Sequence, residues 1–228
     1  MRRDLLDRIR ADRAAKRTVV VATTVDTSAQ VAVHPFEDAE PAWLVQAARA
    51  AARADRSGEV EGPEGPVFLQ VFNPPLRMIV IGAIHIAQHL VKMAAMTGFD
   101  VVVVDPRRAW ATEERFPGTT LRRQWPREAF EALAPDRRTA VVTLTHDSKI
   151  DDPALQAALR SDVFYIGALG SPRTQDKRAR RFREAGFGDE DLARIRGPVG
   201  LDIGARSTAE ISVAILAEVV RDLRRGDA

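Results

Sequence analysis

The feature that most constrains the fold is a series of four short apolar runs in the last two thirds of the chain. These runs are MIVI at 78–81, VVVV at 101–104, AVVTL at 140–144 and VFYI at 163–166. Each is apolar throughout instead of alternating with polar residues, which is typical of strands covered on both faces. Helical patterns separate the runs, and strands that alternate with helices build a parallel sheet. The sequence therefore predicts an α/β fold, a Rossmann-like parallel sheet with helices on both faces.

A pair of prolines after Asn73 coincides with a change in composition and marks the predicted domain boundary. Residues 1–75 are predicted to form a small N-terminal α/β domain, and residues 76–228 the Rossmann-like domain. The elements expected in the first domain are an opening amphipathic helix, strands at 18–24, 30–34 and 66–72, and an Ala-rich helix at 41–54. In the second domain, helix starts are indicated by Asp152 before Pro153, by Ser171 before Pro172, and by Ser207 with Glu210.

The composition argues against several classes of function. The chain of 228 residues has 34 Lys and Arg against 32 Asp and Glu, and a net charge of +2 is too weak to indicate nucleic-acid binding. No cysteine is present, which excludes disulfides, thiolate metal sites and a cysteine nucleophile. No apolar run approaches the roughly 18 residues of a bilayer span, and charged residues interrupt the opening segment. We therefore expect no membrane span, no secretory signal and a cytoplasmic location.

Ligands of a doubly wound sheet bind outside the carboxyl ends of the strands, so the residues that follow the apolar runs are the candidates. The first are Gly82, Ala83, Ile84 and His85, where a strand passes into a helix whose free N–H groups favour an anion. The motif G-x-G-x-x-G requires a second glycine at 84, and an isoleucine side chain there obstructs a pyrophosphate. The turn therefore indicates ordinary NAD binding, a dinucleotide in another pose, or a plain connection.

His85 and His89 lie four residues apart and could share one helix face, as metal ligands do. However, residue 86 is Ile instead of the Glu of the H-E-x-x-H zinc motif, and no third ligand is evident, so no metal site is expected. We expect His85 to face a ligand from the helix start, whereas His89 is interpreted as a packing residue.

Asp105 follows the second apolar run, 23 residues after Gly82. This is near the interval of about 20 at which an acidic residue binds ribose hydroxyls in such folds. Arg107 could add a phosphate contact or be an ordinary surface arginine. After the third run, Thr145 is expected to contribute to binding. His146 beside Asp147 can act as an acid, a base or a positioning donor, so these two residues are the catalytic candidates.

The last two candidate segments are rich in glycine. The first contains Gly167, Ala168, Leu169, Gly170 and Ser171, and its glycines allow a tight turn before a helix start that can cradle an anion. The second extends from Gly197 to Ser207 and includes Gly200 and Asp202, an acid that the pattern predicts to be buried. This loop is expected to fold over a ligand or over another loop.

Three segments, LTHDSKIDDPAL, FYIGALGSPRT and GPVGLDIGARSTAEIS, resemble the XdhC/CoxI family, the accessory proteins of xanthine dehydrogenase and aerobic carbon monoxide dehydrogenase. The resemblance extends from Met78 to Glu218, with the three motifs in the family's order. It implies a Rossmann domain behind a separate N-terminal domain. It also implies a role in binding the molybdenum cofactor, keeping it safe during sulfuration and delivering it to the apoenzyme.

Two departures from the family pattern are evident. The first turn of the family usually reads Gly-Ala-Gly-His, and here Ile84 replaces the second glycine. The family's N-terminal module, with its glycine-rich cysteine motif, is not recognisable in residues 1–75. We therefore expect a separate companion protein to supply the function of that module.

The leading hypothesis is a maturation factor for a molybdenum hydroxylase of the carbon monoxide dehydrogenase or xanthine dehydrogenase type, with no covalent step of its own. The expected ligand is the molybdenum cofactor as a pyranopterin dinucleotide, or a nucleotide-containing intermediate. His85, His146 and Asp202 would orient this ligand. The expected partners are the apo hydroxylase, the companion protein and a second copy of the chain.

Two alternatives remain open. An oxidoreductase that uses NAD(P) or FAD would take His146 as its acid or base and Asp147 as the group that orients it. Against this alternative, Tyr165 is not part of a Tyr-x-x-x-Lys pair. The second alternative is a docking protein with a vestigial pocket, in which Ile84 would fill the cleft.

Overall fold

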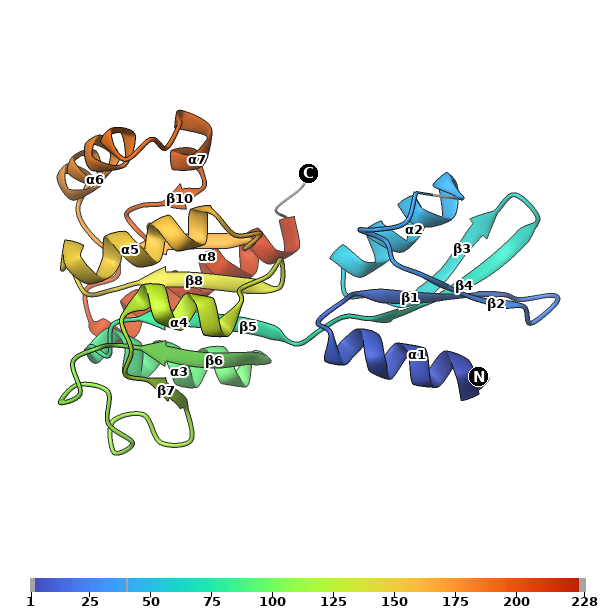
Figure 1. The fold of residues 1–228 in the computed structure, drawn as a ribbon, viewed down its shortest axis with the longest axis horizontal. Coiled ribbons are helices and arrows are strands. Elements are labelled where there is room, and N and C mark those ends of the chain that lie inside the picture. Colours follow the sequence, from blue (N-terminus) through green and yellow to red (C-terminus); the bar gives the residue numbers. More distant parts are fainter. Residues whose placement is uncertain (1–2, 40, 226–228) are drawn as a thin grey trace. The chain divides into compact units, whose positions relative to one another are not determined.

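The computed structural model in Figure 1 describes residues 3–39 and 41–225. The chain divides into two compact units, residues 1–74 and 75–228. Each unit has apolar clusters of its own. No helix in the part of the chain that the structure describes has the length and apolar character required to cross a membrane.

The first unit is an antiparallel sheet with one helix on each face. Its elements are α1 (Arg3–Ala14), β1 (Val19–Thr24), β2 (Gln30–Val33), α2 (Ala42–Arg53), β3 (Gly58–Gly62) and β4 (Gly65–Phe72), and the strand order is β2-β1-β4-β3. Side chains alternate along a strand, so Val20 of β1 packs on the side of α2, whereas Val21 packs on the side of α1. The buried Asp12 of α1 forms a 2.9 Å hydrogen bond with His34, just after β2.

The second unit is a parallel sheet with helices on both faces. Its elements are β5 (Leu76–Ile81), α3 (His85–Met96), β6 (Phe99–Val104), β7 (Thr120–Arg122), α4 (Pro126–Leu133), β8 (Thr139–Thr143), α5 (Ser148–Leu159), β9 (Tyr165–Ala168), α6 (Pro172–Glu184), α7 (Asp189–Ala193), β10 (Ile195–Arg196) and α8 (Thr208–Arg225). The strand order is β10-β9-β8-β5-β6-β7, with parallel pairings. The order reverses at β5, as in the doubly wound Rossmann fold. The predicted fold class is confirmed.

Two apolar clusters, one on each face of the sheet, form the core of the second unit, and helices cover both faces (Figure 1). Helices α3 and α8 cover one face, where Leu90 and Ile215 are fully buried. Helices α4 and α5 cover the other face, where Phe130 and Leu155 are buried. Because alternate residues of β5 belong to the two clusters, its run of apolar residues is explained by coverage on both faces.

The predicted helix starts at Ser171 and Ser207 are confirmed by their cap hydrogen bonds. The predicted start at Asp152 is wrong, because α5 begins at Ser148 and Pro153 lies inside the helix. The earlier start is favoured because the carboxylate of Asp147 accepts a hydrogen bond from an N–H group of the first turn.

Candidate functional site

The turn after β5 is closely packed against the loop after β8. Gly82 has a φ of 105°, and a Cβ atom at this position would lie 2.5 Å from the Cγ2 atom of Thr145. Glycine is therefore required both by the backbone conformation and by the space available. The next N–H group, that of Ala83, donates a 2.8 Å hydrogen bond to Oδ2 of Asp105. The first three candidate segments thus meet at one edge of the sheet.

The carboxylate of Asp105 is fully buried and is occupied by internal donors. Arg107 donates from its backbone N–H and from Nε to Oδ1, both at 2.9 Å, and from Nη2 to Oδ2 at 2.7 Å. Burial alone would raise the pKa of Asp105, but the bonds from Arg107 and Ala83 outweigh burial and lower it. Asp105 therefore fixes the turn after β5, and the expected contact with a ribose would require one of these donors to leave.

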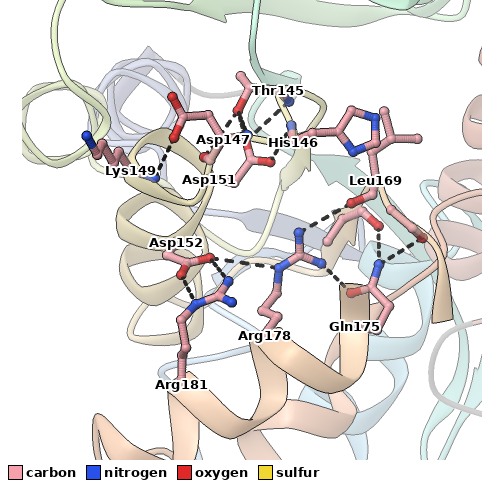
Figure 2. Close-up of polar contacts among 12 residues, drawn as sticks. Thr145, His146, Asp147, Lys149, Asp151, Asp152, Leu169, Gln175, Arg178 and Arg181 are labelled. Atoms are coloured by element: carbon pink, nitrogen blue, oxygen red, sulfur yellow. Dashed lines mark hydrogen bonds and ion pairs between the residues drawn. The ribbon is translucent and has the colours of Figure 1, made fainter. Parts of the chain in front are cut away.

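The loop between β8 and α5 is organised around the buried Asp151, which Figure 2 shows below Thr145. This carboxylate accepts hydrogen bonds from Oγ1 of Thr145 at 2.7 Å and from the N–H groups of Thr145 and His146 at 3.3 and 3.1 Å. Burial raises the pKa of Asp151 above its usual range. Asp147 in turn accepts from the N–H of Lys149 at 2.9 Å. Two carboxylates of the chain itself therefore lie at the start of α5, where Asp147 accepts from one N–H group of the first turn.

The two catalytic candidates do not form an acid–base pair in this structure. His146 is exposed and has a φ of 61°, in the left-handed region that is uncommon for residues other than glycine. The Asp147 carboxylate caps α5. Within the described ranges 3–39 and 41–225, no hydrogen bond links this carboxylate to the His146 imidazole. The catalytic role of these two residues stays a prediction.

The loop between β9 and α6 is held through its carbonyl oxygens. Nε2 of Gln175 donates to the carbonyl oxygens of Ala168 at 3.0 Å and Gly170 at 3.2 Å. Nη2 of Arg178 donates to the carbonyl of Leu169 at 3.3 Å, and its Nη1 donates to Gln175 (Figure 2). These contacts come from α6 and leave the backbone donors at the start of that helix available.

Arg178 is the charged centre of the contact between α5 and α6. Its side chain is only 4% exposed, and its Nε lies 4.0 Å from Oδ1 of Asp152. Burial lowers the pKa of Arg178, while the charges of Asp151 and Asp152 oppose that shift. Arg181 adds a bidentate pair with Asp152, at 2.6 and 3.0 Å. Arg178 was not among the predicted site residues, although its spacing of four from the buried Phe182 is a signal for a buried helix face.

The glycine-rich segment after β10 packs against the end of β9. Val199 donates from its N–H to the carbonyl of Ala168 at 3.2 Å. Gly167 is required here, because a Cβ atom would lie 2.5 Å from Cγ2 of Val199. Oε2 of the buried Glu218 accepts from the Tyr165 hydroxyl at 2.6 Å and from the Gly200 N–H at 2.8 Å. The loop is therefore anchored to β9 and α8 on the same edge.

Asp202 corrects an expectation, since it is exposed instead of buried. Gly200 lies close to α8, where a Cβ atom would be 3.1 Å from the backbone N atom of Ile215, whereas a Cβ atom at Gly204 would meet no atom within 4 Å. His89, interpreted as a packing residue, is exposed as well. The Ile84 side chain is partly buried against the apolar cluster of α3 and α8, so only part of it lies over the start of α3.

The starts of α3 and α6 on this edge retain backbone donors. At α3, the N–H groups of His85 and Ile86 donate to no internal acceptor among residues 3–39 and 41–225. At α6, the same is true, within those ranges, of the N–H groups of Ser171 and Arg173. The start of a helix carries partial positive charge, so both positions suit an anionic group.

A doubly wound sheet with such donors at its carboxyl edge defines a protein of the Rossmann class that can hold a phosphate-bearing ligand. A model of the XdhC Rossmann domain matches residues 78–219 of the chain. This match covers more than half of the chain, and the chain belongs to that family.

Relatives with similar sequences come from two bacteria. The chain is 33% identical over 172 residues to the uncharacterized protein YqeB of Escherichia coli K12, over 74% of this chain and 31% of that protein. It is 34% identical over 148 residues to the E. coli K12 molybdenum cofactor insertion chaperone PaoD, over 65% and 40% of the two chains. It is 31% identical over 160 residues to a probable xanthine dehydrogenase subunit of Bacillus subtilis 168, over 70% and 46%. The matches thus cover less than half of each relative.

A solved structure shares the fold. The crystal structure of a xanthine dehydrogenase from Bacillus halodurans aligns with a TM-score of 0.70 and 24% identity, over 97% of this chain and 67% of that chain. At this identity the similarity supports the fold, and the site is argued from the residues above.

Proposed function

We propose that the chain is a maturation factor for a molybdenum hydroxylase of the xanthine dehydrogenase or carbon monoxide dehydrogenase type. It binds the molybdenum cofactor, or a nucleotide-containing intermediate of it, as cargo. The observation that carries this proposal is the pair of helix starts at α3 and α6, whose donors remain available on one edge. Family membership and the description of PaoD as a molybdenum cofactor insertion chaperone support it.

The chemistry of a pyranopterin dinucleotide fits this edge. Its pyrophosphate needs several N–H donors and positive charge, which a helix start supplies. Its pterin has an edge of hydrogen-bonding groups that can pair with the exposed backbone beside Ser171. Arg107, 34% exposed, adds a cation close to α3. Because the cofactor is large, a ligand that reaches both helix starts would be held by backbone donors instead of by one dominant side chain.

The loops of the edge are held by groups that leave those donors free. Buried carboxylates of Asp105, Asp151 and Glu218 hold three loops through their N–H groups. The loop between β9 and α6 is held through its carbonyl oxygens instead, by Gln175 and Arg178. The start of α6 can therefore receive an anion without losing an internal hydrogen bond. This loop is the position where we expect the strongest contact with the cofactor.

The role needs no covalent chemistry from the chain. Bound to the edge, the cofactor would be held in one orientation and then passed to the apo hydroxylase in the cytoplasm. The companion protein expected from the sequence would supply the function of the cysteine motif. His85 and the exposed His146 are available to orient the ligand from the loops after β5 and β8.

A pair of matched substitutions tests this proposal. The full chain is titrated with extracted molybdenum cofactor by calorimetry, beside Ser171→Glu and Ser148→Glu. Ser171→Glu places a carboxylate at the start of α6, where it competes with an anion for the free donors. We expect its affinity to fall at least about tenfold, which corresponds to about 1.4 kcal/mol. Ser148→Glu adds the same charge at α5, whose start is already occupied by carboxylates, and should change the affinity less than about twofold, or about 0.4 kcal/mol.

Two results would contradict the proposal. One is wild-type binding no tighter than about millimolar, which corresponds to only about 4 kcal/mol. The other is an equal loss of affinity in both variants, because this would show a general effect of negative charge. Tight retention of NAD(P) or FAD by the wild type would instead favour the oxidoreductase hypothesis.

A further inference from the structure

The loop that follows β6 presents an aromatic ring at the carboxyl edge of the sheet. Trp110 is 40% exposed, which is a large exposure for this side chain. The guanidinium carbons of Arg107 and Arg115 lie over the indole ring, 5.0 Å and 5.4 Å from its centroid. The exposed part of the ring can stack on a planar heteroaromatic ring, and the two cations over the indole lie close enough to attract the phosphates of such a ligand.

The position of this ring is fixed, although the loop has no regular secondary structure. The backbone N–H of Trp110 donates to the backbone carbonyl of Arg107 at 2.9 Å, and Nη1 of Arg115 donates to the backbone carbonyl of Trp110 at 2.8 Å. On either side, Ala111 and Phe116 are buried in the cluster of α3 and α8. The ring is therefore preorganised, which reduces the entropic cost of binding a ligand.

The same loop is joined to α3, where backbone donors are available for a phosphate group. Nε2 of Gln88, in the first turns of α3, donates to the carbonyl of Arg115 at 3.3 Å. Arg107 is held in turn by the buried Asp105, through both Nε and Nη2. A nucleotide with its phosphates at the start of α3 would thus have its base near the loop that carries Trp110.

This arrangement changes the residue that is expected to recognise the nucleoside. Folds of this kind commonly use the acid at the end of the second strand to bind the ribose. Here that acid, Asp105, is occupied by Ala83 and Arg107. Trp110 is the large exposed side chain that follows it in the loop.

We propose that Trp110 is the stacking surface for the purine or pyrimidine base at the nucleoside end of the bound cofactor, with Arg107 and Arg115 beside its phosphates. This inference rests on the proposed function and adds the contact that holds the base. Every base has a π face, so stacking on Trp110 supplies affinity with little preference for one base over another.

Tryptophan fluorescence locates the base directly. The full chain contains 3 tryptophans, and Trp125 is 51% exposed, so Trp125→Phe is a matched control for Trp110→Phe. CMP, GMP and AMP are titrated separately, and inorganic pyrophosphate serves as a phosphate probe without a base. We expect the three nucleotides to quench the fluorescence of the wild type and of Trp125→Phe, and not that of Trp110→Phe. Pyrophosphate should quench none of them.

Affinity for extracted molybdenum cofactor is the second readout. Trp110→Leu should weaken binding about tenfold, or about 1.4 kcal/mol, because the stacking surface is lost. Trp110→Phe retains a ring and should stay within about threefold of the wild type. If Trp110→Leu does not fold, as judged by thermal unfolding, the fluorescence comparison decides.

The outcomes separate this inference from the proposed function. If the wild type binds the cofactor and Trp110→Leu binds it equally well, the stacking role is overturned and the proposed function stands. Quenching that disappears in Trp125→Phe instead of Trp110→Phe also overturns it. If the wild type binds neither the nucleotides nor the cofactor, both proposals are overturned.

Discussion

Buried polar residues, more than the exposed ones, determine the geometry of the carboxyl edge. Asp105, Asp151 and Glu218 each accept a hydrogen bond from the backbone N–H of a different loop. A buried group of this kind is costly to disturb, because its partner is left without a hydrogen bond away from water. Substitution of these residues should therefore lower stability directly. It should weaken ligand binding indirectly, by displacing the loop whose N–H group the carboxylate accepts from.

Asp105→Asn should destabilise the protein by about 3 kcal/mol, because the amide offers one acceptor oxygen where four internal donors converge. Urea denaturation at pH 7 measures this loss. Asp100→Asn, at an exposed position of β6, the strand that precedes Asp105, is the control and should change stability by less than about 0.5 kcal/mol. Equal effects of the two substitutions would contradict the role assigned to Asp105.

The pH dependence of this pair of variants follows from the lowered pKa of Asp105. In the unfolded chain the carboxyl group titrates near its usual value of about 4. Its contribution is therefore present above that pH and is lost as pH falls through the lower pKa of the folded state. The free energy of unfolding of Asp105→Asn should therefore fall less steeply than that of the wild type as the pH is lowered into the acid range. The same steepness in both proteins would contradict the prediction.

Tyr165→Phe should lower the free energy of unfolding at pH 7 by about 2 kcal/mol, because it removes a buried hydrogen bond to a carboxylate. Burial and the neighbouring Glu218 raise the pKa of the Tyr165 hydroxyl. The stability that this hydroxyl contributes is therefore complete below about pH 10, its usual pKa, and declines as pH rises above it.

Comparison of Tyr165→Phe with the wild type isolates the contribution of the Tyr165 hydroxyl to stability. Tyr165 is the sole tyrosine of the chain, so tyrosinate absorbance reports on it alone. It should appear in the wild type only when alkaline unfolding occurs. Tyrosinate in the folded protein near pH 10 would show that the hydroxyl is accessible and that the assigned contact is wrong.

Among the elements of the second unit, α6 determines the conformation of the loop that we assign to the cofactor. Arg178→Leu should expose the amides of 169–174 to solvent exchange at least about tenfold faster, because the contact with Leu169 and Gln175 is lost. Arg180→Leu removes an exposed arginine of the same helix and should leave exchange unchanged. Hydrogen exchange followed by mass spectrometry compares the two, and similar protection in both variants would show that Arg178 does not hold the loop.

The sequence predicted the regular elements of the second unit better than their contacts. Strands β5, β6, β8 and β9 lie at the expected apolar runs, since a continuous apolar run reports burial directly. The short β7 and β10, of three and two residues, have too few residues to form a pattern. The start of α5 was missed because Asp147 and Asp152 are both plausible caps, and the choice depends on tertiary contacts.

The sequence predicted which segments form the candidate site, but it did not predict the contacts that their side chains make. Chain order fixes which loops follow the strands of a parallel sheet, so the five segments could be located. Whether a carboxylate is free depends on partners distant in sequence. Asp105 accepts from Ala83, which lies 22 residues away, and also from Arg107, whose pairing with this carboxylate the sequence pattern did not indicate. The burial of Arg178, which was not predicted, and the exposure of Asp202, which was predicted to be buried, depend on the fold in the same way.

On the scale of the whole molecule, the two compact units have separate cores, and we infer that residues 76–228 fold alone. Expressed by itself, this segment should show one cooperative urea transition and retain cofactor affinity within about threefold of the full chain, a difference of less than about 0.7 kcal/mol. The absence of a cooperative transition would mean that residues 1–75 complete the fold of the second unit.

Native mass spectrometry of the gently purified full chain, after incubation with extracted molybdenum cofactor, measures whether the chain retains this ligand. We expect a mass increase that matches one pyranopterin dinucleotide per chain in the wild type and in Ser148→Glu, and a much weaker signal in Ser171→Glu. A chain that keeps no such ligand, or that carries a nicotinamide or flavin dinucleotide in its place, would contradict the proposed function.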